Sequence, residues 1–222
     1  MSEKYMKLTI KEIEQLRRDY TGKWLDESGI DRDPFRLFQR WMEDALNAGV
    51  PDPHAMALAT VSPEGKPSVR IVLLRGVDAG GFTFYTNYHS RKATEADANQ
   101  YVALTFFWHQ LDRQIRVEGK VSAIEKAESD KYFASRPRGS QIAAWASQQS
   151  EVISGREELE RKFRRIEEQF SGGSVPRPEY WGGMKVKANA IEFWQGRPNR
   201  LHDRILFTLQ PDGGWAIKRL AP

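Results

Sequence analysis

Three basic residues near the C-terminus have a spacing that suits an anion-binding surface. Arg200, His202 and Arg204 alternate with other residues in a run that is typical of a β-strand. Their side chains should therefore project from one face and span about 13 Å. Without a counter-charge these groups would repel one another. A carboxylate such as Asp203 on a bent strand could supply that charge, but we favour an anionic ligand.

A second pair of arginines flanks an apolar run. Arg70 and Arg75 lie on either side of residues 71–74, and residues five apart on a regular strand point to opposite faces. The two guanidinium groups could thus hold two anionic groups on the two sides of one strand. The alternative is that one of them is a solvated residue at the rim.

The tripeptide Ser90-Arg91-Lys92 follows a predicted strand and begins a predicted helix. At such a position free backbone N–H groups favour an anion, and here a hydroxyl group and two cations lie beside them. On its own this tripeptide is a weak signal.

Tyr132, Arg136 and Ser140 are spaced by four residues. Pro137 disfavours helical backbone at Arg136, so the segment should form a helix end, a turn and a new helix start. Ser140 would then lie near the N-terminus of the second helix, with Arg136 and the Tyr132 hydroxyl close by, which is a natural phosphate site. The alternative is that Tyr132 is a core residue and the other two form a turn.

Several classes of function are disfavoured by what the chain lacks. It has no cysteine, so disulfides, thiolate metal ligands and a thiol nucleophile are excluded, and redox chemistry would need a bound organic cofactor. We find no G-x-G-x-x-G or G-x-x-x-x-G-K-[ST] nucleotide motif. The four histidines form no H-E-x-x-H pair, and we expect no metal site; they are His54, His89, His109 and His202.

Composition bounds the partners and the location. The chain has 222 residues, of which 40% are hydrophobic, which is enough to bury the core of one domain. Its 34 Lys and Arg residues against 30 Asp and Glu are scattered, so a nucleic-acid partner is not required. The charged N-terminus lacks the apolar centre of a signal peptide, and no apolar run approaches the ~20 residues of a membrane span. We expect a cytoplasmic protein with no membrane partner.

The elements that must position these residues are mostly strands. Alternating apolar residues and short turns predict antiparallel strands that form a barrel or closed sheet; the ranges are 55–61, 67–75, 81–87, 101–109, 113–124, 184–195, 200–209 and 214–219. Capping signals and apolar periodicity predict helices at 9–20, 33–49, 91–98, 126–135, 140–148 and 154–170. The first helix should begin at a Thr9–Glu12 capping box and the last at a Ser154–Glu157 capping box.

Taken together and in order, these clusters resemble one family, the bacterial pyridoxine/pyridoxamine 5'-phosphate oxidases. The resemblance covers almost the full length, through the motifs RIVLLR, FYTNYHSRKA, FFWHQLDRQIRVEGK, YFASRPRGSQIAAWASQQS, EYWGG, IEFWQG, NRLHDR and the terminal RLAP. It implies a mainly β split barrel with peripheral helices. It also implies a helix and loop at 1–32 that could form a lid, and a flavin mononucleotide (FMN)-binding domain at 33–222 that includes the C-terminal strands.

The resemblance further implies a homodimer with FMN bound noncovalently at its interface. Pyridoxamine 5'-phosphate and pyridoxine 5'-phosphate would be oxidised by O2 to pyridoxal 5'-phosphate, with hydrogen peroxide released, and ammonia from the amine. This reaction would be the final step of vitamin B6 cofactor synthesis and salvage.

Residue roles also follow from the resemblance. FMN would be bound by Arg70, Ile71, Val72, Leu73, Leu74, Arg75, Tyr85, Thr86, Arg91, Lys92, Gln114, Gln149, Ser150, Trp194 and Arg204. The substrate would be bound by Arg17, Tyr20, Arg75, Tyr132, Arg136, Ser140, Arg200, Leu201 and His202. Arg200 and His202 would be catalytic, polarising the substrate and assisting proton movement. Arg17 and Tyr20 would belong to the lid.

One residue departs from the family pattern. The family commonly has Lys where this chain has Arg75, and a planar guanidinium group cannot be assumed to take the place of an ammonium group. Two other functions are therefore kept: a split-barrel flavin oxidoreductase with a different substrate, and a noncatalytic FMN- or pyridoxal-phosphate-binding protein. The presence of both YFASRPRGS and NRLHDR argues against the first.

Overall fold

The computed structural model describes residues 19–20, 24–26 and 29–222. The helix expected at 9–20 lies outside these ranges except for residues 19 and 20, and the lid residue Arg17 lies outside them as well. Within the described part of the chain, no helix has both the length and the apolar character needed to cross a membrane.

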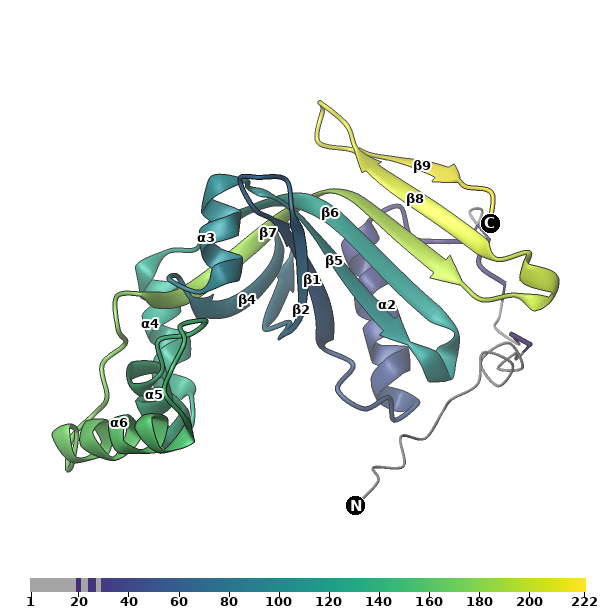
Figure 1. Cartoon of the computed structure of the whole chain (residues 1–222). Helices are drawn as coiled ribbons and strands as arrows, with labels where there is room; N and C mark the ends of the chain where they lie inside the picture. Colours follow the sequence, from purple (N-terminus) through teal and green to yellow (C-terminus); the bar gives the residue numbers. More distant parts are fainter. Residues whose placement is uncertain (1–18, 21–23, 27–28) are drawn as a thin grey trace, which may run out of the picture.

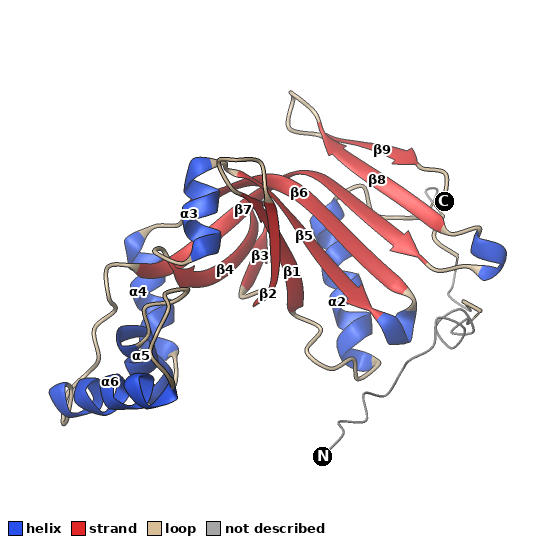
Figure 2. Cartoon of the chain, viewed as in Figure 1, coloured by secondary structure: helices blue, strands red, loops and turns tan. Residues whose placement is uncertain are grey.

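Strands dominate the fold, and helices lie around them (Figures 1 and 2). The strands are β1 (Ala55–Val61), β2 (Pro67–Leu73), β3 (Gly76–Asp78), β4 (Gly81–Asn87), β5 (Tyr101–Trp108), β6 (Arg113–Ala123), β7 (Trp181–Gln195), β8 (Asp203–Leu209) and β9 (Trp215–Arg219). The helices are α2 (Pro34–Asn47), α3 (Arg91–Ala98), α4 (Lys126–Ser135), α5 (Arg138–Ala146) and α6 (Arg156–Gln169), with short 3-10 turns η1 (His109–Leu111) and η2 (Pro198–Arg200).

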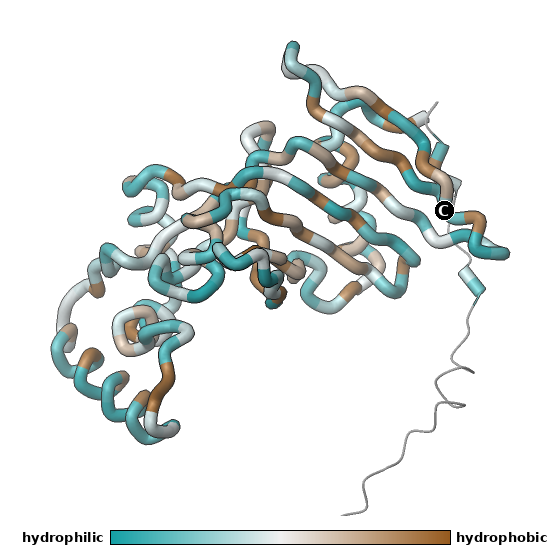
Figure 3. Tube along the Cα trace, turned by 45° about the horizontal axis from the view of Figure 1, so that its top comes forward, coloured by the Kyte–Doolittle hydropathy of each residue, from teal (hydrophilic) through white to brown (hydrophobic). Residues whose placement is uncertain are grey.

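The strands form one curled, antiparallel sheet in the order β2-β1-β5-β6-β7-β4-β3, and β8 and β9 extend it from β7. The long strand β7 pairs with β4 along its first half and with β8 along its second half. This confirms the expected mainly β split barrel. Apolar and polar residues alternate along the central strands (Figure 3), as expected when one face of a sheet is buried.

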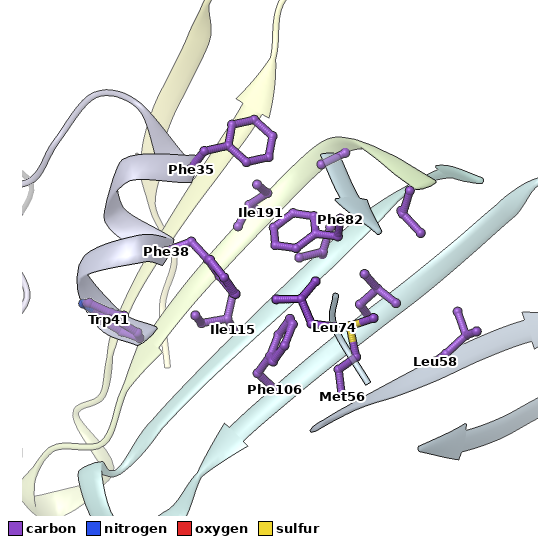
Figure 4. Close-up of a cluster of buried hydrophobic side chains, with 14 of the residues drawn as sticks. Phe35, Phe38, Trp41, Met56, Leu58, Leu74, Phe82, Phe106, Ile115 and Ile191 are labelled. Atoms are coloured by element: carbon purple, nitrogen blue, oxygen red, sulfur yellow. The ribbon is translucent and has the colours of Figure 1, made fainter. Parts of the chain in front are cut away.

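Helix α2 closes the buried face of the sheet. The Asp33 side chain caps it by accepting a hydrogen bond from the Phe35 N–H at 2.9 Å, and Pro34 occupies the first turn. Its apolar stripe includes Phe38, which contacts Phe82 and Phe106 with ring centroids 5.0 and 5.1 Å apart. Figure 4 shows these rings in the core. The predicted helix at 33–49 is confirmed.

Helices α4, α5 and α6 stand at one end of the sheet and share a second apolar core (Figure 1). Gln141 joins α4 to α5 by donating from Nε2 to the Phe133 carbonyl at 2.9 Å. Most residues of α6 are hydrophilic, with a few apolar residues between them (Figure 3). This group of helices forms one wall of the site described below.

Three local predictions were wrong. Strand β8 begins only at Asp203, because Asn199 and Arg200 take left-handed φ angles of 56° and 61° in η2. Arg200, His202 and Arg204 therefore do not lie along one regular strand, and the expected single face is not formed.

The other two errors concern where elements begin and end. Strand β2 ends at Leu73, and the Arg75 N–H donates instead to the Thr83 carbonyl at 2.8 Å, so the strand does not run on to Arg75. Helix α6 begins at Arg156, two residues later than expected. Ser154 therefore donates from its N–H and hydroxyl to Glu158, at 2.9 and 2.7 Å, and forms no capping box with Glu157.

Candidate active site

A cavity of about 590 Å³ opens between the sheet and the helices α4 and α5. Its sheet side comes from the end of β2 and from β4, and its other side comes from the α4–α5 turn. Many of the residues predicted to bind a ligand line it, namely Ile71, Val72, Leu73, Arg75, Tyr85, Thr86, Lys92, Tyr132, Arg136, Ser140 and Gln149. The structure thus brings together residues from three of the clusters found in the sequence.

At one end of the cavity Lys92 lies in the first turn of α3. Its buried ammonium group donates to Thr86 Oγ1, Ser90 Oγ and Gln149 Oε1, at 3.2, 3.0 and 3.1 Å. Burial, and then the charge of Arg70, lower the pKa of Lys92 to about 8. The Arg91 N–H contacts Ser150 Oγ at 3.2 Å. A cation held by neutral oxygens at a helix start is suited to an anionic ligand.

Arg70 does not line this cavity, although Lys92 beside it does. Its guanidinium group bonds Thr60, Ser68 and the Leu58 carbonyl, and it lies 3.4 Å from the Glu95 carboxylate. The prediction that Arg70 and Arg75 point to opposite faces of one regular strand is wrong, because the strand ends at Leu73. Arg75 lines the cavity, whereas Arg70 contacts the Glu95 carboxylate.

Glu95 is the acidic centre of this neighbourhood. It also accepts from Arg91 Nε at 2.8 Å. Burial alone would raise the pKa of Glu95, but hydrogen bonds from Ser68, Thr60 and Arg91 lower it to about 2. The carboxylate is therefore ionised near neutral pH and balances part of the positive charge of Arg70 and Arg91.

The other end of the cavity is formed by the α4–α5 turn. Arg136 ends α4, Pro137 precedes α5, and Ser140 lies in the first turn of α5, as the proline predicted. Arg136 Nη1 is buried and has no hydrogen-bond partner in the described part of the chain. Burial lowers the pKa of Arg136, and the positive charge of Arg75 lowers it further. Two adjacent cations with an unsatisfied donor form a site that an anion would complete.

Tyr132 combines both of the roles considered for it. Its ring is half-buried and stacks on Tyr85 with centroids 3.8 Å apart and planes 15° apart, while it also lines the cavity. Burial raises the pKa of Tyr85 to about 12, so the Tyr85 hydroxyl keeps its proton.

Sequence reasoning missed several residues of the cavity wall: Asn87, Pro137, Ala143, Ala144, Ser147 and Trp181. Trp181 begins β7, and its ring centroid lies 4.5 Å from the Arg136 guanidinium carbon. Only the EYWGG motif pointed to this residue, and the motif alone gave no contact with Arg136.

A second group of predicted residues lies elsewhere, at the far end of β7. Gln114 and Arg204 flank Trp194 on the neighbouring strands β6 and β8. Arg200, Leu201 and His202 belong to the connection between β7 and β8. Among these, Arg204 is held by the Glu192 carboxylate through Nε and Nη2, at 2.8 and 3.1 Å.

A backbone hydrogen bond selects one tautomer of the neutral His202 ring. Its Nδ1 accepts a hydrogen bond from the Arg197 N–H at 3.0 Å, so the neutral ring carries its proton on Nε2. Burial, and then the charge of Arg200, lower the pKa of His202. Tyr20, the described residue of the expected lid, contacts the ring of His202 edge-on with centroids 5.2 Å apart.

The two groups are separated within one chain. Tyr85 pairs with Gly183 near the start of β7, whereas Trp194 is eleven residues further on, which is about 36 Å along the strand. Figure 1 shows the helices α4 and α5 and the turn η2 at opposite ends of the molecule. One chain therefore does not bring Trp194, Arg200, His202 or Arg204 to the cavity.

Two family models match this chain. A family model described as pyridoxamine 5'-phosphate oxidase matches residues 42–170. A second model, described as the pyridoxine 5'-phosphate oxidase C-terminal dimerisation region, matches residues 181–222.

Relatives named pyridoxine/pyridoxamine 5'-phosphate oxidase match along almost the whole chain. The protein from Rubrobacter xylanophilus is 54% identical and the alignment covers 96% of this chain and 97% of the relative. The protein from Cupriavidus taiwanensis is 52% identical, with 95% and 99% covered.

Two solved structures are similar in fold. The structure of PhzG from Burkholderia lata, in complex with tetrahydrophenazine-1-carboxylic acid, has a TM-score of 0.85 at 28% identity, covering 90% of this chain and 99% of that chain. A pyridoxamine 5'-phosphate oxidase-related, FMN-binding protein from Nostoc punctiforme has a TM-score of 0.69 at 14% identity, covering 87% and 100%. The family model over residues 42–170 and the relatives at 52% and 54% identity show that the chain belongs to the pyridoxamine 5'-phosphate oxidase family.

Proposed function

We propose that the protein oxidises pyridoxamine 5'-phosphate and pyridoxine 5'-phosphate with O2 to pyridoxal 5'-phosphate, as an FMN-dependent homodimer. The observation that carries this proposal is the buried, unpartnered Nη1 of Arg136 beside Arg75, in a cavity whose other end holds Lys92. Two separate cationic ends in one cavity suit two phosphate groups, one from a cofactor and one from a substrate.

The hydrogen-bond donors at the Lys92 end support binding of the FMN phosphate there. Lys92, Thr86, Ser90 and the start of α3 would hold that phosphate, with Gln149 and Ser150 completing the surroundings. When bound, FMN would accept a hydride equivalent from C4' of the substrate and transfer its electrons to O2, which gives hydrogen peroxide. The protein contributes binding and orientation.

The Arg136 end would hold the phosphate of the substrate. Arg75, Arg136, Ser140 and the Tyr132 hydroxyl surround that space. When the substrate phosphate is bound at this end, the position of the reacting carbon in the cavity is restricted. The binding energy of the phosphate is thereby used to orient the substrate.

The remaining functional residues would come from a second chain. Trp194 lies about 36 Å along β7 from Gly183, the partner of Tyr85, and Arg200, His202 and Arg204 follow it in the connection to β8 and on β8. A complete site therefore needs two copies. An exposed apolar strip on β2 and β5 supports a homodimer: Val69 is 68% exposed, Ile71 66% and Phe107 56%. The match of residues 181–222 to a dimerisation region adds support.

His202 and Arg200 would act on the substrate ring from the second chain. Because Nδ1 of His202 accepts the Arg197 N–H, its Nε2–H is the group that can donate to the substrate or hold a proton. Arg200 supplies a permanent positive charge that can polarise the substrate.

The direct test is to mix FMN-loaded protein with each substrate in air and to measure pyridoxal 5'-phosphate and peroxide. We expect both products in equal amounts. FMN binding without either product would instead identify a carrier or sensor and overturn the enzymatic proposal.

Sharing of the site between chains has its own test. Arg136→Ala and Arg200→Ala should each be nearly inactive, because each variant removes, from every site, a residue that one of the two chains contributes. When the two variants are unfolded together and refolded, the sample should regain about a quarter of wild-type activity, because half of its dimers are mixed and each mixed dimer has one of its two sites intact. No recovery from well-folded mixed dimers would show that one chain forms the whole site.

A further inference from the structure

Arg136 is stabilised in an unusual way for a half-buried cation. Within the described residues it forms no ion pair. Its guanidinium carbon lies 4.5 Å from the ring centroid of Trp181 and 5.5 Å from that of Phe133. Its Nη1 is buried and makes no hydrogen bond. Aromatic rings, and not a carboxylate, are therefore the groups that face this charge.

Other arginines predicted to bind a ligand are held differently. Arg70 and Arg91 both contact Glu95, and Arg204 is bound in a fork by Glu192. In each case a carboxylate takes guanidinium N–H donors that a ligand would otherwise use.

The two modes of support leave different donors free. A carboxylate binds in the plane of the guanidinium group and occupies its N–H groups. An aromatic ring attracts the cation through the negative face of its π system and needs none of those N–H groups. A phosphate group would thus compete with a carboxylate but not with a ring.

We propose that Trp181 is a positioning residue that holds the Arg136 guanidinium by a cation–π contact and keeps its donors available for the phosphate of the substrate. Trp181 then determines how strongly the site prefers phosphorylated ligands over unphosphorylated ones. This inference rests on the proposed function, which places a substrate phosphate at Arg136.

The backbone of Trp181 is held in place on both sides of its Cα atom. Its backbone N–H donates to the Pro178 carbonyl at 3.1 Å, and its backbone carbonyl accepts from Arg177 Nη1 at 2.6 Å. Arg177 also pairs with Asp130 of α4 at 2.6 Å. The start of β7 is thereby tied to α4, the helix that directly precedes Arg136.

The Trp181 ring also touches the other side of the phosphate site. It stacks nearly parallel to Tyr85 at 5.4 Å and 14°, and it lies parallel to Tyr132 at 6.2 Å and 3°. Trp181 therefore contacts two of the residues that line the proposed phosphate space, Arg136 and Tyr132.

The test measures binding of two probes to FMN-loaded protein, pyridoxal 5'-phosphate and pyridoxal. Trp181→Leu removes the ring and should weaken pyridoxal 5'-phosphate binding roughly 2- to 30-fold, the usual range for a cation–π contact. Binding of pyridoxal and of FMN should change little. Trp181→Phe keeps an aromatic face and should lie between the wild type and Trp181→Leu. In turnover, the KM for pyridoxamine 5'-phosphate should rise while kcat stays nearly constant.

Trp145→Leu is the matched control. Trp145 belongs to the same apolar cluster but contacts Phe170 and Tyr180, with centroids 5.4 and 6.2 Å away. It reports the cost of losing a tryptophan from this cluster without removing the Arg136 contact. We expect the preference for pyridoxal 5'-phosphate over pyridoxal to be unchanged in this variant.

A double-mutant cycle keeps the proposal testable if Trp181→Leu does not fold. In an Arg136→Ala background, Trp181→Phe should have no further effect on pyridoxal 5'-phosphate binding. An equal loss for both probes, or a loss that persists without Arg136, would overturn the positioning role.

Failure of this inference and failure of the proposed function give different results. The wild type could bind pyridoxal 5'-phosphate more tightly than pyridoxal and yet oxidise neither pyridoxamine 5'-phosphate nor pyridoxine 5'-phosphate. In that case the enzymatic function is wrong, and the Trp181 variants still test the contact with Arg136. If the wild type turns over normally and Trp181→Leu keeps the full phosphate preference, only the positioning role is wrong.

Discussion

The Arg70 guanidinium group lies 3.4 Å from the Glu95 carboxylate, within the sheet–helix boundary and not in the cavity. Arg70 is therefore already paired in the free protein. Its charge acts on Lys92, whose pKa it helps to lower. Arg70 would thus affect cofactor binding indirectly, by lowering the pKa of Lys92 and by holding helix α3 in place through Glu95.

Glu95 should make stability depend on pH in the acid range. Its pKa in the folded protein is about 2, below the ordinary value of 4.5. A lowered carboxyl pKa stabilises the fold above pH 4.5, and this contribution is lost as the pH falls from 4.5 towards 2. The difference in unfolding free energy between wild type and Glu95→Gln, measured by urea titration, should be larger at pH 6 than at pH 3.

Asp97→Asn, an exposed change on the same helix α3, is the control and should show little difference between the two pH values. A constant difference for Glu95→Gln across this range would mean that the carboxylate is not held in its ionised form.

Lys92 should make FMN binding depend on pH in the alkaline range. In the free protein its pKa is lowered to about 8, and a bound phosphate dianion would raise it. The positive charge of Lys92 then contributes fully to FMN binding below pH 8, and this contribution is lost as the pH rises. The FMN dissociation constant should therefore increase by up to roughly tenfold per pH unit above 8.

Riboflavin, which lacks the phosphate, should bind more weakly than FMN and show little of this pH dependence. Lys92→Met should flatten the FMN profile. Parallel profiles for FMN and riboflavin in fluorescence titrations would show that Lys92 does not face the phosphate.

Arg75 should bind the substrate phosphate even though the family commonly has Lys at this position. It lines the cavity and its charge lowers the pKa of Arg136, which places the two cations near one another. Loss of a charge-assisted contact costs about 1.5–3 kcal/mol, so Arg75→Ala should lower kcat/KM by roughly 10- to 150-fold. Arg75→Lys should be mild. An unchanged kcat/KM for Arg75→Ala would make this residue a solvated cation at the rim.

Arg200 and Arg204 should serve different ligands. Arg204 is held by Glu192 beside Trp194, and we expect Arg204→Ala to lower FMN affinity. Arg200 lies in the turn η2, and no carboxylate among residues 19–20, 24–26 and 29–222 binds it in this way, so Arg200→Ala should keep nearly normal FMN content and lower turnover. FMN dissociation constants and single-turnover flavin reduction separate these effects. If Arg200→Ala loses FMN but reduces bound flavin at the normal rate, the two roles are assigned the wrong way round.

Local chemistry allowed the sequence to determine much of the architecture. The alternation of apolar residues and the short turns predicted the strands, since strand backbone and turn type depend on neighbouring residues. Asp33 and Pro34 predicted the start of α2 for the same reason. Pro137 predicted the break between α4 and α5, and with it the meeting of Arg136 and Ser140 at one end of the cavity.

Contacts between distant parts of the chain were decided only by the tertiary structure. Glu95 meets Arg70 across 25 residues and Trp181 meets Arg136 across 45, and no local preference encodes such pairs. The left-handed backbone of Asn199 and Arg200 also ended the apparent strand pattern of residues 200–204. Most of all, the register of β7 places Trp194 and Arg204 far from the cavity. Side-chain types can identify a ligand, but only the order and length of the strands fix which residues one chain can bring to it.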